Sequence, residues 1–181
     1  MSDTFLSFAL STTAVGWVVE TQQRETSKGF LRCDMHYDIT SAIPWERHQA
    51  TLELAVFGTP NCLGRDDLFL RFWATVTAAQ RGPDRLWLVT RDNSNRVGTF
   101  LHAAAEVVTK SDPHAVLGPA YNPVLDVNTA LYLRGVSLTT TLPHRENELP
   151  LDSLVAQARH NLRVLHDLHL GRDVFEEPWE M

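Results

Sequence analysis

The chain has 181 residues and a formal net charge of −6 at pH 7, and 44% of its residues are hydrophobic. This composition is typical of a folded globular protein and excludes a disordered chain, a collagen-like repeat and a disulfide-stapled miniprotein. A negative surface repels phosphates and anionic lipid heads, so nonspecific nucleic-acid binding and membrane-surface binding are disfavoured.

The cysteines and the N-terminal residues predict the cellular compartment. Cys33 and Cys62 form neither a CxxC motif nor a disulfide framework, so we expect free thiols in a reducing compartment. The first six residues carry no basic segment, and apolar runs such as residues 14–19 are too short to span a bilayer. The sequence therefore predicts a cytoplasmic protein without membrane insertion.

The N-terminal third of the chain predicts strands. Residues 5–10 and 14–20 are short apolar segments around a polar turn, and the polar residues 21–29 predict a loop. Residues 30–40 and 50–57 alternate between apolar and polar side chains, which is typical of strands with one solvent-exposed face. We expect these last two strands to pair antiparallel.

The remaining chain alternates between helical and strand patterns. Apolar residues recur at helical spacing over residues 66–79, 97–108 and 152–165, and residues 86–89 predict a short buried strand. Residues 127–142 are rich in β-branched side chains and predict a long strand or a hairpin bent at its glycine.

Together these elements predict an α+β fold with a mainly antiparallel sheet and two to three helices packed on one face. An α/β arrangement in three layers is the alternative. Residues 1–171 are expected to form one globular domain, and residues 172–181 form an acidic, aromatic C-terminal tail.

One strand face carries a candidate metal site. Asp34, His36 and Asp38 lie two residues apart, so on a strand they share one face about 6.5–7 Å apart. Glu53 on the neighbouring predicted strand would add a fourth ligand, and such a site would activate water for hydrolysis. The alternative is an ordinary solvated strand face.

The last predicted helix and the tail carry candidate partner-binding residues. Val164 and Leu168 lie off the main apolar stripe of the helix and would form a second apolar surface. Trp45 falls in a predicted loop, and Phe175 and Trp179 stand among acids in the tail. Aromatic side chains in such places are typical anchors of protein contacts.

The same helix carries a histidine cluster, and the sequence lacks common catalytic motifs. His166 and His169 are three residues apart on one helix face, but zinc sites on helices more typically use pairs four residues apart. The sequence contains no GxSxG elbow, no GxxxxGK[ST] loop and no GxGxxG fingerprint. We therefore expect no cofactor.

Two stretches resemble parts of known families. Residues 5–20, with Ser-Thr-Thr at 11–13 and Val-Gly-Trp at 15–17, resemble the first hairpin of actin-like ATPases, although the acid that those enzymes use there is absent. The order of elements from residue 50 to 165, with a long strand at 128–138, is similar to the core of rhabdovirus matrix proteins. That family's basic, proline-rich N-terminal arm is missing here.

These observations predict a non-catalytic protein that binds a protein partner or forms a homo-oligomer. Adaptors, chaperone or immunity proteins and self-assembling structural subunits all fit this description. A viral matrix-like structural protein is one alternative, implied by the resemblance. A metal-dependent hydrolase that uses the Asp34, His36 and Asp38 face is the other.

Overall fold

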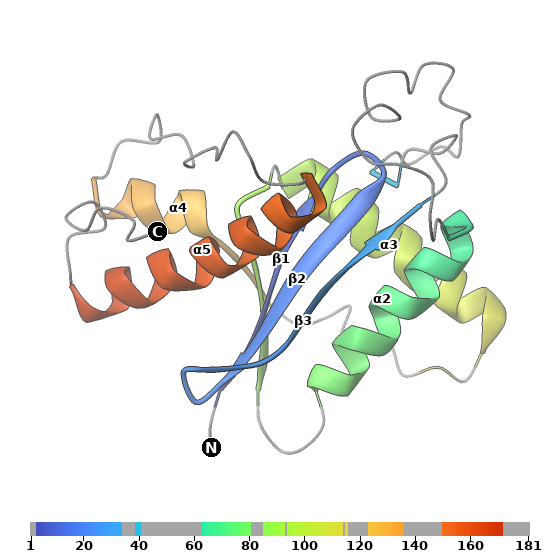
Figure 1. Cartoon of the computed structure of the whole chain (residues 1–181), viewed down its shortest axis with the longest axis horizontal. Helices are drawn as coiled ribbons and strands as arrows, with labels where there is room; N and C mark the ends of the chain where they lie inside the picture. Colours follow the sequence, from blue (N-terminus) through green and yellow to red (C-terminus); the bar gives the residue numbers. More distant parts are fainter. Residues whose placement is uncertain are drawn as a thin grey trace.

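The computed structural model describes residues 3–33, 39–40, 63–80, 85–92, 94–113, 115, 123–135 and 150–171. The described residues form a five-stranded sheet with the strand order β3-β2-β1-β4-β5, and helices pack against it (Figure 1). In chain order the strands are β1 (Thr4–Leu10), β2 (Ala14–Thr21), β3 (Arg24–Arg32), β4 (Leu86–Thr90) and β5 (Val124–Asp126), and the helices are α2 (Arg65–Ala79), α3 (Ser94–Ser111), α4 (Val127–Leu133) and α5 (Pro150–Leu170).

The sheet combines antiparallel and parallel pairing around β1. Strands β1, β2 and β3 form an antiparallel meander, whereas β4 pairs parallel to β1 and β5 pairs parallel to β4. Parallel neighbours need crossover connections, and here the described helices α2 and α3 lie within those connections. The α+β class is confirmed, and the sheet is mixed and not purely antiparallel.

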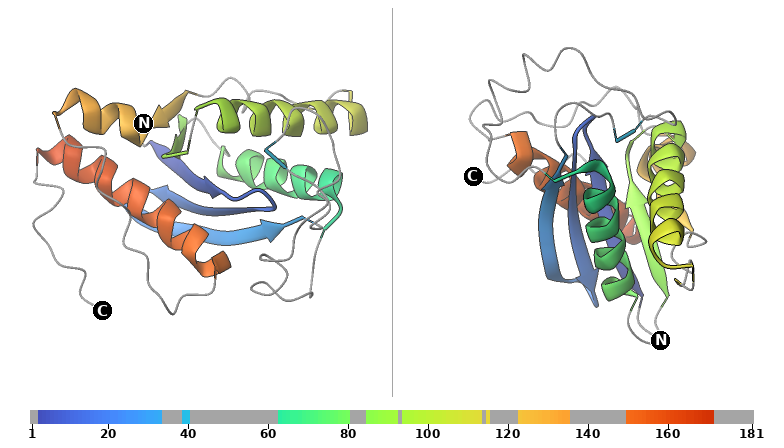
Figure 2. Two further views of the ribbon diagram at one scale, coloured as in Figure 1. Left: turned by 90° about the horizontal axis from the view of Figure 1, so that it is seen from above. Right: turned by 90° about the vertical axis from the view of Figure 1, so that its right-hand side faces the viewer.

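Both faces of the central strands are covered by helices. Helices α2 and α3 pack on one face, where the largest apolar cluster includes Leu6, Phe8 and Phe100. Helix α5 crosses the other face over β1 and β2, where Val18 and Leu162 join the second cluster. The two views in Figure 2 show the sheet between these helical layers. The expectation of helices on one face is therefore wrong, because helices cover both faces of the central strands and form three layers with the sheet.

Helix α5 is held on the sheet by close packing near its start and by polar contacts in its middle and towards its C-terminal end. A Cβ atom at Gly16 would lie 2.6 Å from the Leu154 Cβ, so β2 and α5 approach each other closely at this glycine. Arg159 donates to both carboxylate oxygens of Glu25 on β3, at 2.9 and 3.3 Å. His166 Nε2 lies 2.5 Å from the Glu20 carboxylate on β2.

Strand β3 corrects the loop that the sequence predicts at residues 21–29. The chain turns at Gln22 and Gln23, whose φ angles of 53° and 60° suit a tight two-residue hairpin turn, and β3 begins at the next residue. Residues 24–28 are exposed because β3 is an edge strand of the described sheet. Their polarity therefore reflects exposure to solvent and not the lack of a strand.

Helix α4 replaces the first part of the long strand or bent hairpin predicted at residues 127–142, and residues 136–142 lie outside the described residues. Asp126 caps the helix, because its carboxylate accepts from the Asn128 backbone N–H at 3.0 Å and from the Thr129 hydroxyl at 2.7 Å. Gly135 adopts a φ of 71° directly after the helix. The cap and the glycine outweigh the strand preference of the β-branched side chains between them.

The strand predicted at residues 30–40 is confirmed only over residues 30–32, which belong to β3, because residues 39–40 form a turn. Residues 34–38 and the strand predicted at 50–57, with the expected antiparallel pairing, lie outside the described residues. Six other predicted elements are confirmed. Strands β1, β2 and β4 and helices α2, α3 and α5 lie where the periodicity places them. Within the described part of the chain, no helix combines the length and the apolar character that crossing a bilayer requires.

Two glycine-to-alanine variants test the packing of α5 on the sheet. We expect Gly16→Ala to lower the free energy of unfolding by about 1–3 kcal/mol, because the added methyl group meets the α5 backbone and the Leu154 side chain. The matched control is Gly98→Ala in α3, where a Cβ meets nothing within 4 Å and the free energy of unfolding should rise by about 0.5–1 kcal/mol. Urea unfolding measures both, and equal effects would contradict the close approach.

Candidate functional site

The carboxyl ends of the three parallel strands form the first candidate site. Because β1, β4 and β5 run in the same direction, their carboxyl ends lie at one edge of the sheet. The chain leaves β1 towards β2 on one side and leaves β4 towards β5 on the other. Open sheets commonly bind ligands where consecutive connections diverge in this way.

Asp92 bridges the two diverging strands at this edge. Its Oδ2 accepts a hydrogen bond of 2.8 Å from the backbone N–H of Leu10, and its Oδ1 lies 3.6 Å from an Arg96 guanidinium nitrogen. Arg96 also donates to the Leu10 carbonyl oxygen at 3.4 Å. Burial raises the pKa of the Asp92 carboxyl above its ordinary value, while the contacts from Leu10 and Arg96 lower it.

A second polar group joins β4 to α4 at the same edge. The Arg91 Nε donates to the Asn128 Oδ1 at 2.9 Å, and the Asn128 side-chain amide donates to the Arg91 carbonyl oxygen at 3.0 Å. Partial burial lowers the pKa of the Arg91 guanidinium, and the nearby Asp126 carboxylate opposes this effect. Both Asp126 oxygens cap α4, as described above.

The polar contacts at this edge connect structural elements. Asp92 joins β1 to the start of α3, and Asp126 begins α4. Among the residues that the structure describes, no three His, Cys, Asp or Glu side chains form a group able to hold a metal ion. These hydrogen bonds indicate that both carboxylates have structural roles: Asp92 holds the end of β1 near α3, and Asp126 caps α4.

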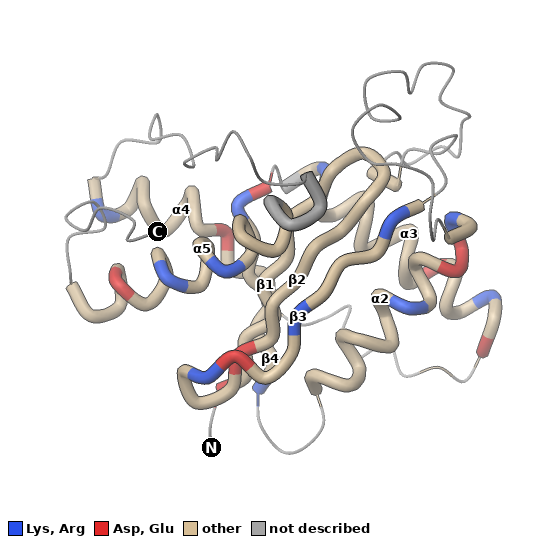
Figure 3. The backbone as a smooth tube through the Cα atoms, viewed as in Figure 1, with Lys and Arg blue, Asp and Glu red and all other residues tan. Residues whose placement is uncertain are grey.

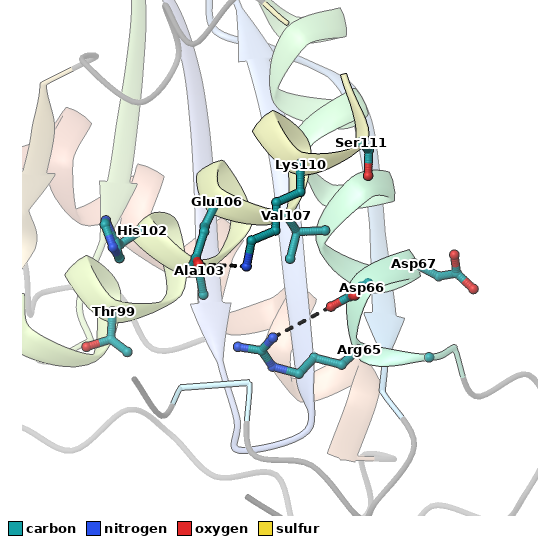
Figure 4. A pocket seen from close by; sticks show the side chains of 11 residues that line it. Arg65, Asp66, Asp67, Thr99, His102, Ala103, Glu106, Val107, Lys110 and Ser111 are labelled. Carbon is teal, nitrogen blue, oxygen red and sulfur yellow. Dashed lines mark hydrogen bonds and ion pairs between the residues drawn. The ribbon is translucent and has the colours of Figure 1, made fainter. Parts of the chain in front are cut away.

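A groove between α2 and α3 is the second candidate site. It has a volume of about 870 Å³ and runs along the start of α2 and the exposed side of α3 (Figure 4). Its lining is small or polar at most positions: Gly64, Arg65, Asp66, Asp67, Thr99, His102, Ala103, Glu106, Val107, Lys110 and Ser111.

Four of the five Asp, Glu, Lys and Arg side chains that line the groove form two ion pairs. Arg65 lies 3.6 Å from the Asp66 carboxylate, and its guanidinium stacks 4.8 Å from the centre of the Phe69 ring. Lys110 Nζ lies 2.7 Å from Glu106, and this hydrogen bond lowers the pKa of the Glu106 carboxyl. Figure 3 shows both basic and acidic positions on α2 and α3. The pairing leaves little net charge to select a ligand of either sign.

The third candidate is an apolar surface at the C-terminal ends of α4 and α5. We call it the α4–α5 patch and define it as Tyr132, Leu133 and Leu170, which are 71%, 76% and 54% exposed. Arg134 donates to the Leu168 carbonyl oxygen at 2.8 Å, so the ends of the two helices meet. Figures 1 and 2 both show these helix ends side by side. An exposed group of large apolar side chains commonly marks a binding surface.

The structure corrects two of the predicted partner-binding residues. Val164 and Leu168 are 2% and 8% exposed and belong to the second apolar cluster beneath α5. The face of α5 that the sequence places outside the main stripe is buried because α4 and the sheet contact the helix on different sides. Both residues stabilise the fold, and neither is accessible to a partner.

The other predicted site residues lie outside the described residues. These are Trp45, Phe175 and Trp179 of the partner surface and Asp34, His36, Asp38 and Glu53 of the metal site. Their assignments stay predictions.

The histidines of α5 have separate environments. His166 contacts Glu20, and its ring meets the Phe5 ring edge-on at 5.8 Å. His169 is exposed in the last turn of the helix. Burial, together with the positive charges of Arg91 and Arg163, lowers the pKa of His160 to about 4.

Sequence reasoning missed the α4–α5 patch. Tyr132 and Leu133 fall in the segment that the sequence assigns to a strand, where alternate residues would be buried. The aspartate at position 126, followed by residues with helical spacing, is the signal that would have placed them on a helix.

Comparisons with known proteins complete the description of the sites. The chain matches no family model, no curated protein and no solved structure. Its function is therefore inferred from the side chains of this chain.

Two variants of Asp92 separate its hydrogen bond from its charge. We expect Asp92→Ala to lose about 1–3 kcal/mol of unfolding free energy, because the Leu10 N–H loses its acceptor. Asp92→Asn keeps an acceptor oxygen and removes a charge that burial disfavours, so its loss should stay below about 1 kcal/mol. Urea unfolding at neutral pH distinguishes them, and equal losses would assign the effect to the ion pair with Arg96.

The lowered pKa of His160 predicts a loss of stability in acid. The unfolded chain binds this proton near pH 6.5 and the folded chain only near pH 4, so the free energy of unfolding falls as the pH drops through this interval. We expect His160→Gln to show a smaller fall in melting temperature between these pH values. His169→Gln on the same helix is the control, and a response equal to that of His160→Gln would contradict the assignment.

Proposed function

We propose that the protein acts without catalysis by binding another protein, a separate partner or a second copy of this chain, through the α4–α5 patch. The observation that supports this most directly is the exposure of Tyr132, Leu133 and Leu170 at the C-terminal ends of α4 and α5, where the two helices meet (Figure 1). Fully burying a large apolar side chain contributes roughly 1.5–3 kcal/mol, so a partner that covers the three gains substantial binding free energy.

The arginines that border the patch also suit the binding of a protein. Arg134 follows Leu133 directly and is exposed. Its guanidinium donates to the Leu168 carbonyl oxygen of α5, so a charged group borders the apolar side chains of the patch. The Arg163 side chain is 43% exposed and lies two helical turns before Leu170, which places both on one side of α5. Protein contacts commonly combine an apolar centre with a polar rim, and arginine is favoured there.

The contacts at the other two candidate sites favour structural roles. Asp92 and Asp126 have their carboxylates engaged in joining strands and capping a helix. In the groove between α2 and α3, Glu106 is paired with Lys110 and Arg65 with Asp66. The large side chains of the patch, by contrast, are exposed and lie where two helices end together.

A single substitution in the patch tests this function. Leu133→Asp should leave the fold unchanged because the side chain is exposed, and it should weaken the protein contact at least tenfold by placing a charge in an apolar interface. Light scattering across a concentration series measures self-association, and quantitative comparison of proteins captured by each variant measures partner binding.

The control introduces the same charge elsewhere. Thr77 is exposed on α2, on the opposite side of the sheet, so Thr77→Asp should leave both measurements unchanged. The proposal fails if Leu133→Asp behaves like wild type in both measurements while circular dichroism shows that both variants are folded.

A further inference from the structure

We infer that the acidic C-terminal tail of the same chain, residues 172–181, binds the α4–α5 patch and competes with the protein partner. This inference rests on the proposed function, because it concerns the regulation of the same surface. Its basis is the position where α5 ends, the chemistry of the patch and the sequence that follows it.

The geometry at the end of α5 brings the start of the tail to the patch. Gly171 has a φ of 67°, which ends the helix, and its N–H donates to the Leu168 carbonyl oxygen at 3.3 Å. Arg134 donates to the same oxygen, so the last turn of α5 contacts the end of α4. Leu170 belongs to the patch, and the tail begins two residues after it.

The tail and the patch have complementary chemistry. The tail contains four acids and one arginine, a net charge of −3, which is half of the net charge of the whole chain. Phe175 and Trp179 are its large aromatic side chains. The patch offers apolar contacts from Tyr132 and Leu133 with the exposed Arg134 beside them. Aromatic anchors among acids therefore suit an apolar surface bordered by arginine.

Covalent attachment makes even a weak contact effective. Ten residues span at most about 33 Å when extended, and the patch begins within a few residues of the attachment point, so the tail reaches it readily. A short tether holds a ligand at an effective concentration on the order of 1 mM. If the free tail segment binds the patch with a dissociation constant of about 0.1 mM, the attached tail lowers the affinity of a competing partner for the patch about tenfold.

A labelled synthetic peptide of residues 172–181 tests the inference on the full-length chain. The double variant Phe175→Ser, Trp179→Ser keeps the tail but removes its anchors, so the patch becomes available. Fluorescence anisotropy should show about tenfold tighter peptide binding to this double variant than to wild type. Adding Leu133→Asp to the double variant should abolish this binding, whereas adding Thr77→Asp should not change it.

The remaining outcomes separate the two proposals. Equal peptide binding to wild type and the double variant, or no binding to either, overturns the tail inference. A wild-type dimer that becomes monomeric in the double variant also overturns it, because the tail then occupies a second copy. The proposed function is judged separately by Leu133→Asp in the otherwise unchanged chain, so it can hold while the tail inference fails.

Discussion

The structure depends on the burial of both faces of the central strands. Every residue of β2 from Ala14 to Val19 is buried, and alternate side chains enter different apolar clusters on the two faces of the sheet. A strand of this kind is stable only if helices cover both faces, because an uncovered face would expose a row of large apolar side chains. The positions of α2 and α3 on one side and α5 on the other follow from this constraint.

The polar groups of the fold largely serve this layered arrangement. Asp92 holds the end of β1 against the start of α3, and Glu20 and Glu25 hold α5 on the meander. Buried or half-buried polar groups need such partners, since leaving them unsatisfied is costly. Carboxylates used in this way illustrate why acids at strand ends do not by themselves identify a reactive centre.

The α4–α5 patch has a different origin. Helix α4 is only seven residues long, so its buried residues Val127 and Leu131 attach it to the core while Tyr132 and Leu133 extend beyond the sheet. The end of α5 extends with it, which leaves Leu170 exposed. A surface that the core does not need, placed beside the attachment point of an acidic aromatic tail, suits binding that the tail regulates.

Most of the helices and strands could be predicted from the sequence, because residues buried at regular intervals appear as a periodic pattern of apolar residues. Such patterns identified β1, β2, β4, α2, α3, α5 and the last residues of β3. Residues 24–29 of β3 were assigned to a loop because they are polar, and α4 was assigned to a strand because of its β-branched residues. Only the tertiary structure decided which face each apolar stripe covers, and it placed Val164 and Leu168 inside the core. The exposed patch likewise depends on where two helices distant in sequence end together, and such contacts leave no periodic signal in either helix.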